Sequence, residues 1–231
     1  MTGGNRNNIT ALIRNAAKSG RQALSEYESK QVIAAAGVPV TREALAHSRQ
    51  EAIDQAAAIG FPIALKGSSP ALTHKTEMDM VRLNLKDKED VARAYDDLTG
   101  KGIDLDSVLV QEMVKGHREF VIGLTRDPQF GPAVMFGLGG IFTEAMKDVS
   151  FRVAPLSEGD ALEMIGEIRA AKLLDAFRGE KAVDRDVLVQ ALVGIGSLGL
   201  MHDEIAEIDI NPLVVKDGRP VAVDALVILK K

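Results

Sequence analysis

The sequence contains no cysteine and no tryptophan, and aromatic residues make up only 4% of the chain. Without cysteine the chain can form no disulfide, no thiolate metal site and no thiol nucleophile, which is consistent with a reducing compartment. So few aromatic rings argue against a surface that stacks the bases of single-stranded nucleic acid. The net charge of −5, with no block of basic residues, argues against nonspecific binding to nucleic acid.

Long hydrophobic runs are absent as well. No segment approaches the roughly 18 consecutive apolar residues of a membrane-spanning helix, and the N-terminal sequence MTGGNRNNIT lacks the apolar core of a signal peptide. We therefore expect a soluble, cytoplasmic protein that does not bind membranes. Its 231 residues, 46% of them hydrophobic, can bury a large core in one domain or in two closely packed subdomains.

The order of the predicted elements indicates an α+β fold. A capping box at residues 25–28 predicts a helix that ends before Gly37-Val38-Pro39. Strands are then predicted near Val40 and at 61–66 and 80–85, and helices at 48–59 and 87–98. Four further segments with short turns between them favour a second, antiparallel sheet: 108–113, 120–125, 132–136 and 151–154. Helices that begin at Ser157 and Asp184 then lead to the C-terminal strands.

Near the C-terminus, two apolar runs flank Asp217-Gly218, which is a strong signal for a two-residue β-hairpin turn. Such a turn places Asn211 directly opposite Asp224, with their Cβ atoms about 4.5–5.5 Å apart. Because side chains alternate along a strand, Asp209 lies on the same face. Three oxygen-bearing side chains then converge. A site with few carboxylates suits Mg²⁺, which completes its coordination with water and nucleotide phosphate.

Two features leave this assignment open. Pro212 has no N–H to donate at a position where the strand ladder needs one, so a bulge or a shift in register can occur there. The same residues are also compatible with an ordinary hairpin whose polar side chains face water.

Four other segments could carry chemistry, each with a simpler alternative. Lys66 ends an apolar strand, where its ammonium could emerge at the edge of a cleft and bind phosphate, or could simply extend into solvent. Residues 111–113 close a strand whose backbone could meet an adenine edge, or form the end of a hairpin. Glu119 could accept hydrogen bonds from ribose hydroxyls. The glycines at 137–140 could let backbone amides approach phosphate, although such a run usually means a tight turn.

The order of these sites resembles the nucleotide site of ATP-grasp proteins. Four segments carry a closer resemblance: LSEYESKQVIAAAGVPV, GFPIALKGSSPALTHKTEMDMVRLNLK, GLGGIFTEAMKDVSFRVAPL and EIDINPLVV. They resemble the ATP-grasp subunit of nucleoside-diphosphate-forming acyl-CoA synthetases, which are relatives of succinyl-CoA synthetase β subunits. The resemblance runs from about Leu24 to Val227 and implies an ATP-grasp fold, in which two α+β subdomains clamp the nucleotide. We expect these subdomains at residues 24–107 and 108–231, after an N-terminal extension at residues 1–23.

The resemblance implies a role for each matching residue. Lys66 would bind phosphate, Glu112 and Met113 would contact adenine, and Glu119 would contact ribose. Gly139 and Gly140 belong to the glycine-rich loop of the nucleotide site.

The same resemblance makes Asn211 and Asp224 the Mg²⁺ ligands. Asp209 stands where relatives often carry glutamate, so it would belong to the first or second shell of the ion.

The resemblance also implies a phosphohistidine. In the family, the histidine of a His-Lys-Ser/Thr-Asp segment carries phosphate between the partner subunit and the nucleotide, and here that residue is His74. Its neutral imidazole is nucleophilic near pH 7. Relatives usually continue with Asp-Val-Gly-Gly-Val, whereas this chain continues with Glu77-Met78-Asp79-Met80-Val81. Both glycines are missing, so a segment that must swing could be stiffer here.

The implied function is that of the nucleotide-binding subunit of an ADP-forming acyl-CoA synthetase, which reversibly converts acid, CoA and ATP into acyl-CoA, ADP and phosphate. The CoA-binding and ligase domains would be supplied by a separate α subunit, through which CoA and the carboxylic acid bind, in a heterotetramer. Two alternatives remain. The chain could be a self-sufficient ATP-grasp carboxylate ligase, or a nucleotide-binding module without turnover.

Overall fold

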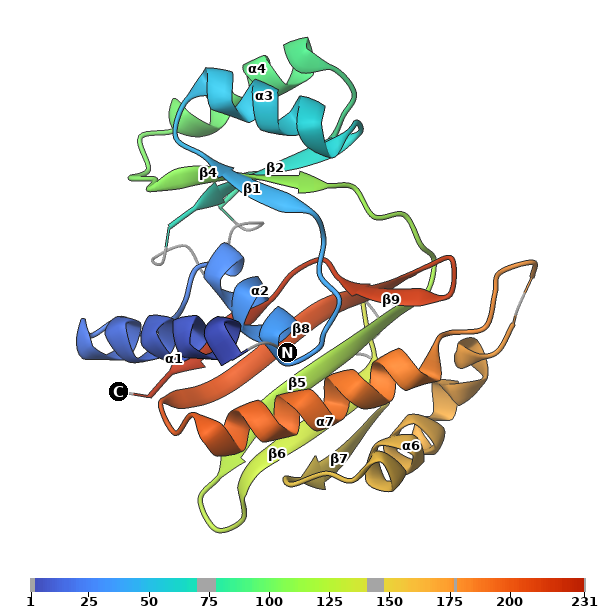
Figure 1. Ribbon diagram of the computed structural model, residues 1–231. Helices are drawn as coiled ribbons and strands as arrows, with labels where there is room; N and C mark the ends of the chain where they lie inside the picture. The colour runs from blue at the N-terminus through green and yellow to red at the C-terminus, as the bar shows by residue number, and fades with distance from the viewer. Residues whose placement is uncertain (1–2, 70–77, 141–147, 177, 231) are drawn as a thin grey trace. The chain divides into compact units, whose positions relative to one another are not determined.

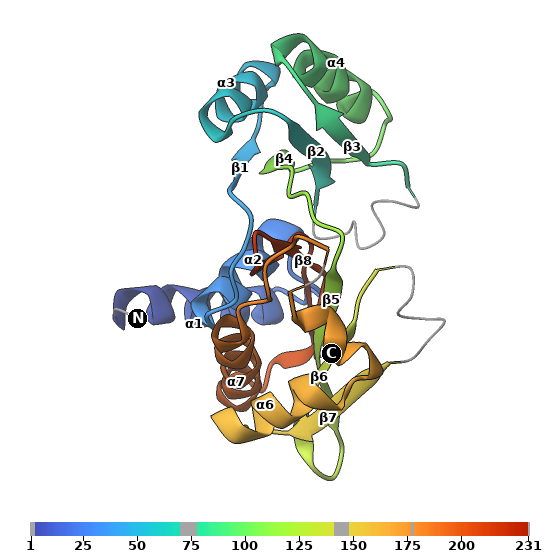
Figure 2. The same ribbon diagram turned by 90° about the vertical axis from the view of Figure 1, so that its right-hand side faces the viewer.

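The computed structural model describes residues 3–69, 78–140, 148–176 and 178–230. The chain divides into two compact units (Figures 1 and 2). Unit 1 comprises Met1–Leu24, Glu28–Val40 and Val114–Lys231, and unit 2 comprises Ser25–Tyr27 and Thr41–Met113. No helix in the described part of the chain is long and apolar enough to cross a bilayer.

Unit 2 is a four-stranded antiparallel sheet with the strand order β1-β4-β2-β3. The strands are β1 (Glu43–Ala46), β2 (Ile63–Ser68), β3 (Val81–Leu85) and β4 (Ser107–Glu112). Helices α3 (Arg49–Ile59) and α4 (Lys88–Thr99) begin at the N-caps Ser48 and Asp87, and both cover the same face of the sheet (Figure 2). Ile63 and Leu65 pack into the core beneath these helices. Alternation along β2 therefore turns Lys66 toward the other face.

The sheet of unit 1 has six strands in the order β10-β8-β5-β6-β7, with β9 paired to β8. Its strands are β5 (Glu119–Asp127), β6 (Gly131–Leu138), β7 (Val149–Val153), β8 (Ile205–Lys216), β9 (Arg219–Ala222) and β10 (Leu226–Leu229). The helical elements are α1 (Gly3–Lys18), α2 (Glu26–Ala35), α6 (Glu158–Glu167), the 3₁₀ helix η1 (Arg169–Leu174) and α7 (Arg185–Met201). In Figure 1, α7 runs along β5 and β6, and α6 lies by β7.

One hydrophobic core joins the helices of unit 1 to its sheet. Ile208 and Ile210 of β8 enter this core, together with Leu192 and Ile195 of α7. The alternate residues of β8, including Asp209, consequently belong to the opposite face of the sheet. That face is where the sequence predicts the metal site.

Three expectations from the sequence need correction. We expected residues 108–113 to join the second sheet, which is wrong, because β4 pairs with β1 and β2 in unit 2. The chain passes to unit 1 only after Met113, rather than at residue 107. The strand expected near Val40 is an isolated bridge to Ala222, and β1 begins at Glu43. In each case the pairing partner is distant in sequence, so local patterns carry little information about it.

The N-terminal residues are an integral part of unit 1. We expected residues 1–23 to form an N-terminal extension. Instead α1 buries Ile9, Ile13 and Ala16 in the core of unit 1, with exposed fractions of 7%, 0% and 4%. Its apolar spacing of three to four residues matches one face of a helix. The helix therefore contributes to the stability of the unit.

Candidate functional site

The C-terminal hairpin has the register that the sequence predicts. Asp217 and Gly218 form the turn with φ angles of 53° and 86°, and the strand pairs run from Leu213↔Ala222 to Lys216↔Arg219. One step beyond the paired strands, the Val223 N–H donates a hydrogen bond to the carbonyl of Pro212 at 3.0 Å. The ladder thus extends in the predicted register to the residues next to Asn211 and Asp224.

An irregularity lies at Pro212, but it affects the pairing of β8 with β5 and not the hairpin, which keeps its register. The register between β5 and β8 shifts between the pairs Phe120↔Leu213 and Ile122↔Ile210, so the two residues of β8 that cause the shift are Asn211 and Pro212. The peptide bond between them is cis. The shift is a β-bulge, a feature that re-aims a side chain where regular pairing stops.

The face of β8 opposite the core concentrates negative charge. The pKa of Asp209 is raised to about 6, first by burial of its carboxyl, which penalises the charged form, and then by repulsion from Glu207 and Asp224. The side chain itself still reaches solvent. Two of the predicted metal ligands, Asp209 and Asp224, are therefore close enough to interact electrostatically. We did not predict that Glu207 would lie beside these carboxylates. Its spacing of two residues from Asp209 could have indicated it, because residues two apart in a strand share a face.

The donor set fits a hard cation that retains much of its water. Two carboxylates and one amide, from Asp209, Asp224 and Asn211, match the few protein oxygens that Mg²⁺ takes when nucleotide phosphate supplies others. Across the described ranges, no group of three or more histidine, aspartate or glutamate side chains is arranged to hold a metal ion. A donor set with so few protein oxygens suits an ion that is shared with a nucleotide.

Glu119 and the glycine-rich loop meet at the start of β5. The Gly139 N–H donates to the Glu119 carbonyl at 2.8 Å. A Cβ atom on Gly139 would lie 2.5 Å from the Phe120 carbonyl oxygen, and one on Gly140 would lie 2.3 Å from Oε2 of Glu119. Gly140 also has a φ of +68°, a conformation that glycine adopts without strain. Residues predicted from two separate patterns are therefore neighbours in unit 1.

Lys66 occupies a different environment from the one expected. Strand β2 continues to Ser68, so Lys66 does not end the strand, and its side chain is only 8% exposed. Its ammonium donates a hydrogen bond to Oε1 of Glu26 at 2.6 Å. Glu26 is itself buried, with 3% of its surface exposed. Sequence reasoning had assigned Glu26 only to the capping box of its helix.

Glu112 and Met113 are fixed by contacts within unit 2. The Glu112 carboxylate accepts hydrogen bonds from the Arg42 backbone N–H at 2.8 Å and from Nη2 of the same arginine at 3.1 Å. The Glu112 N–H donates to the Arg42 carbonyl, and the Met113 N–H donates to the Pro62 carbonyl. These contacts define the backbone path at the predicted adenine-binding segment. The remaining predicted residue, His74, lies outside the described residues.

A family model described as an ATP-grasp domain matches residues 15–229. The chain belongs to the ATP-grasp family. It is 42% identical over 219 residues to the β subunit of acetate–CoA ligase [ADP-forming] I from Pyrococcus furiosus, and the match covers 92% of this chain and 94% of that protein. It is also 38% identical to acetate–CoA ligase [ADP-forming] I from Archaeoglobus fulgidus. That match covers 87% of this chain but only 30% of the longer Archaeoglobus protein.

The structural comparison agrees with these relationships. The dinucleotide forming acetyl-coenzyme A synthetase 1 of Ca. Korarchaeum cryptofilum matches with a TM-score of 0.90 and 44% identity, over 95% of this chain and 98% of that one. A second structure of that enzyme holds coenzyme A and Mg-AMPPCP, with its phosphohistidine segment pointing towards the nucleotide binding site. The recognition of an ATP-grasp protein related to the β subunits of ADP-forming acyl-CoA synthetases, and the α+β ATP-grasp fold, are confirmed. Its enzyme class is ligase.

Two cavities of this ATP-grasp chain lie apart from most of the predicted residues. One, of about 590 Å³, lies beside residues 114–118 and is also lined by 179–181, Val215, Asp217 and Gly218. Buried Arg118 holds segments of this cavity's wall together. The Arg118 guanidinium donates hydrogen bonds to the carbonyls of Leu173 and Asp175 at 3.0 and 3.1 Å. The cavity falls within the size range of small-molecule sites. Sequence reasoning did not identify Arg118, which no motif distinguishes from a surface arginine.

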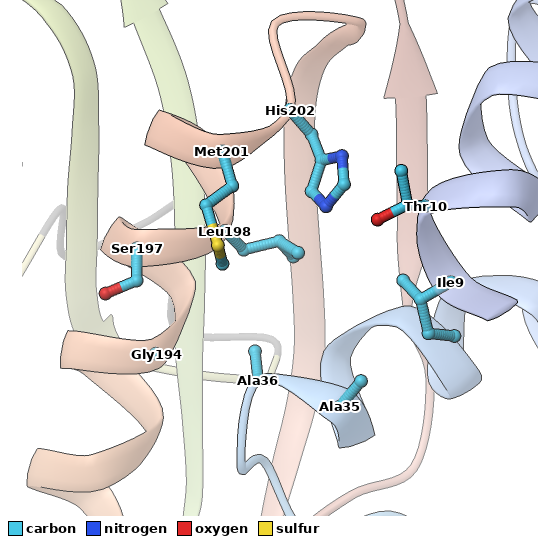
Figure 3. Close-up of a pocket in the computed structure, with 9 residues that line it drawn as sticks. All are labelled: Ile9, Thr10, Ala35, Ala36, Gly194, Ser197, Leu198, Met201 and His202. Carbon is cyan, nitrogen blue, oxygen red and sulfur yellow. The ribbon is translucent and has the colours of Figure 1, made fainter. Parts of the chain in front are cut away.

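The second cavity, of about 170 Å³, lies between α1, α2 and α7 and is mostly apolar (Figure 3). His202 lines it and is only 6% exposed, and its Nδ1 atom has no hydrogen-bond partner among the residues that the structure describes. Burial lowers the pKa of this imidazole below its usual range. His202 caps the C-terminus of α7 and is buried there.

Proposed function

We propose that this chain is the nucleotide-binding subunit of an ADP-forming acyl-CoA synthetase, which reversibly converts a carboxylic acid, CoA and ATP into acyl-CoA, ADP and phosphate. The observation that carries the proposal is the β8–β9 hairpin. The hairpin has the predicted register, and Asp224, which follows it, acts electrostatically on Asp209 in a chain that is 43% identical, over 96% of its length, to a relative solved with Mg-AMPPCP.

The nucleotide contacts follow from the same proposal. Lys66 binds a phosphate group, Glu112 and Met113 contact adenine, and Glu119 contacts ribose. The contact between Glu119 and Gly140 supports this assignment, because it brings the ribose ligand and the phosphate-binding loop to the same point of β5. Glycine at 139 and 140 leaves backbone amides close to a ligand with no side chain in between.

The metal contacts involve Asn211, Asp224 and Asp209. When bound, Mg²⁺ neutralises charge on the phosphate oxygens and so stabilises the transferring phosphoryl group. Asp209 and Asp224 supply the negative charge that holds the ion. Asn211 adds a neutral oxygen at the bulge, where the irregular backbone frees its side chain from regular alternation.

His74 is the proposed carrier of phosphate. Its imidazole nitrogen attacks the γ-phosphorus of ATP, the bond to the bridging oxygen breaks, and ADP leaves with that oxygen. The relative from Ca. Korarchaeum cryptofilum has a phosphohistidine segment that points towards the nucleotide in one structure. His74 lies in the only segment of this sequence that matches the family's His-Lys-Ser/Thr pattern.

The partner in this proposal is an α subunit that supplies the CoA-binding and ligase domains, in a heterotetramer. The Pyrococcus relative is named as a β subunit, and the Archaeoglobus relative is a much longer single chain. CoA and the carboxylic acid bind through that partner. Because ATP and CoA are both cytoplasmic metabolites, we assign the reaction to the cytoplasm.

The proposal is tested by expressing the chain together with a candidate α subunit. With acetate, CoA, Mg²⁺ and γ-labelled ATP, we expect acyl-CoA formation and an acid-labile, base-stable label on the peptide that contains His74. His74→Asn should remove both while nucleotide binding persists. The matched control is His47→Asn, because His47 is an exposed histidine in unit 2.

Two results would overturn the proposal. Full synthetase activity of His74→Asn would mean that phosphate passes by another route. Release of ADP by the chain alone, dependent on an added amine and carboxylic acid, would instead identify a self-sufficient carboxylate ligase.

A further inference from the structure

Asp148 carries a buried carboxylate and immediately precedes the first residue of β7. Only 5% of its surface is exposed. Its Oδ1 atom accepts a hydrogen bond from the Arg169 backbone N–H at 2.7 Å, and its Oδ2 atom accepts one from the Ala170 N–H at 2.8 Å. Asp148 therefore fixes the start of the 3₁₀ helix η1, which lies 21 residues further along the chain.

The Asp148 carboxylate does for η1 what an N-cap side chain usually does. The first N–H groups of a helix have no partner within the helix and need an acceptor from elsewhere. The N-cap residue of η1 is Ile168, whose apolar side chain cannot accept a hydrogen bond. The partial positive charge at the start of a helix also favours a carboxylate there. The fold thus supplies this cap from another element.

Buried Arg118 holds the other end of η1. Its guanidinium donates to the carbonyls of Leu173 and Asp175 at 3.0 and 3.1 Å, where the partial negative charge of a helix C-terminus favours a cation. Arg118 immediately precedes Glu119, the first residue of β5. Through η1, Asp148 is therefore linked to the strand that carries the proposed ribose contact.

The backbone of Asp148 holds the glycine-rich loop. The Leu138 N–H donates to the Asp148 carbonyl at 3.1 Å, and the next N–H along the chain, that of Gly139, donates to the Glu119 carbonyl at 2.8 Å. A Cβ atom on Gly137 would lie 2.6 Å from the same Asp148 carbonyl oxygen, so the two segments are in close contact there. These contacts form a closed ring that runs from Glu119 through η1 and Asp148 to Gly139, and back to Glu119.

We propose that Asp148 is a positioning residue for nucleotide binding, which holds Gly139 and Gly140 in place beside Glu119. This inference rests on the proposed function, in which the glycine-rich loop approaches phosphate. Backbone amides bind phosphate best when they are already oriented, because ordering a loop during binding costs free energy. Asp148 provides this order from outside the nucleotide site, since its carboxylate is fixed on η1 while its carbonyl binds the loop.

This role predicts a selective loss of phosphate binding. Asp148→Asn keeps the size of the side chain but leaves one acceptor oxygen. Whichever way the amide turns, its NH₂ group meets one of the two η1 N–H groups and cannot accept a hydrogen bond from it. The link to η1 weakens, and the loop is held less firmly. Glu119 should stay in place, because β5 pairs with both β6 and β8.

The experiment is calorimetric titration of the full chain with Mg-ADP and, separately, with adenosine, which has no phosphate. Asp148→Asn should bind Mg-ADP about ten-fold more weakly than the native protein, which corresponds to the loss of one hydrogen bond to a charged group. Its affinity for adenosine should change by less than about two-fold, because adenine and ribose do not contact the loop amides. Asp148→Ser also retains one acceptor and should show the same selective loss in case Asp148→Asn does not fold.

A matched control comes from α6. Asp160→Asn also removes a carboxylate that accepts a backbone N–H at the start of a helix, that of Ser157 at 2.8 Å. This variant should leave both affinities unchanged.

Gly140→Ala tests the loop itself, because an added Cβ would lie 2.3 Å from Oε2 of Glu119 and the residue has a φ of +68°. If Gly140→Ala binds Mg-ADP as the native protein does, the nucleotide role of this loop in the proposed function fails.

Two results would overturn the inference alone. If Gly140→Ala binds Mg-ADP weakly while Asp148→Asn binds it with native affinity, Asp148 has no positioning role. If Asp148→Asn loses affinity for Mg-ADP and for adenosine by the same factor, its carboxylate supports the fold of unit 1 and not the phosphate-binding loop.

Discussion

At the scale of single residues, the proposed chemistry depends on charges whose environment differs from one residue to the next. Asp209 of β8 and Asp224, two residues after β9, both reach solvent, and the pKa of Asp209 is raised first by burial of its carboxyl and then by repulsion from Glu207 and Asp224. Lys66 and Glu26 are almost fully buried, and the Lys66 ammonium donates a hydrogen bond to the Glu26 carboxylate. The two aspartates are therefore suited to binding a cation, whereas the buried lysine and glutamate are suited to holding one side-chain conformation.

Removing a proposed metal ligand should abolish activity while the fold is retained. Asp224→Ala should reduce phosphoryl transfer by about a hundred-fold or more, because the ion that neutralises phosphate charge loses a carboxylate. The thermal midpoint should change little, since a partly exposed carboxylate contributes little to stability. Asp203→Ala removes a carboxylate that is 88% exposed and serves as the control. Native turnover by Asp224→Ala would exclude this residue from the metal site.

The buried ion pair predicts an unusual pattern of stability. Lys66→Met alone removes the ammonium that donates to the buried Glu26 carboxylate, and should cost about 3–5 kcal/mol of unfolding free energy. Adding Glu26→Gln should recover much of that loss, because neither remaining side chain carries a charge. Urea unfolding of the native protein, both single variants and the double variant measures this coupling. Strictly additive losses would show that the two residues do not interact.

At the scale of elements, unit 1 is assembled by a close approach between α2 and α7. A Cβ atom on Gly194 of α7 would lie 1.8 Å from the Ala36 carbonyl oxygen, which immediately follows α2. A backbone oxygen cannot move aside as a flexible side chain can. The two segments can approach this closely only because residue 194 has no side chain.

Gly194→Ala should therefore separate the two segments and lower the unfolding free energy by about 3 kcal/mol. The matched control is Gly166→Ala in α6, where an added Cβ would meet nothing within 4 Å. That variant should be neutral or more stable by about 0.5–1 kcal/mol, since alanine favours the helix over glycine. Chemical denaturation of both proteins makes the comparison. Equal effects of the two substitutions would argue against a close crossing of α2 and α7.

At the scale of the whole molecule, stability should depend on pH through the buried imidazole in Figure 3. Burial is the largest effect on His202 and lowers its pKa, Glu204 opposes this, and Arg14 reinforces it. The unfolded chain takes up a proton as the pH falls below about 6.5, while folded His202 stays neutral. Stability is therefore lost as the pH falls from about 6.5 towards the lower pKa of the folded state.

This loss is measured by comparison with a variant that cannot titrate. We expect the unfolding free energy of the native protein, relative to that of His202→Leu, to decrease between pH 7.5 and pH 5.5. Other ionisable groups change in both proteins and largely cancel in the difference. A constant difference across this range would mean that His202 titrates normally in the folded protein.

The order of elements and the hairpin could be derived from the sequence by itself. The turn at Asp217-Gly218 settles the register of β8 and β9 because only two residues separate the strands, so a short-range signal fixes every later pair. The ATP-grasp relationship was recognisable for a similar reason. Its motifs are short segments in a fixed order, and each can be read without knowledge of what lies beside it.

Tertiary structure alone decided which distant residues meet. Nothing near Glu26 in the sequence indicates that it pairs with Lys66, and nothing near residues 108–113 indicates that β4 joins the sheet of unit 2. The pKa of Asp209 is raised first by burial and by Glu207, and Asp224, which lies on another segment of the chain, adds to the shift. Bringing distant residues together costs the entropy of closing long loops. The fold offsets this cost by burying whole apolar faces of sheets and helices, so the contacts depend on the entire chain and not on a local segment.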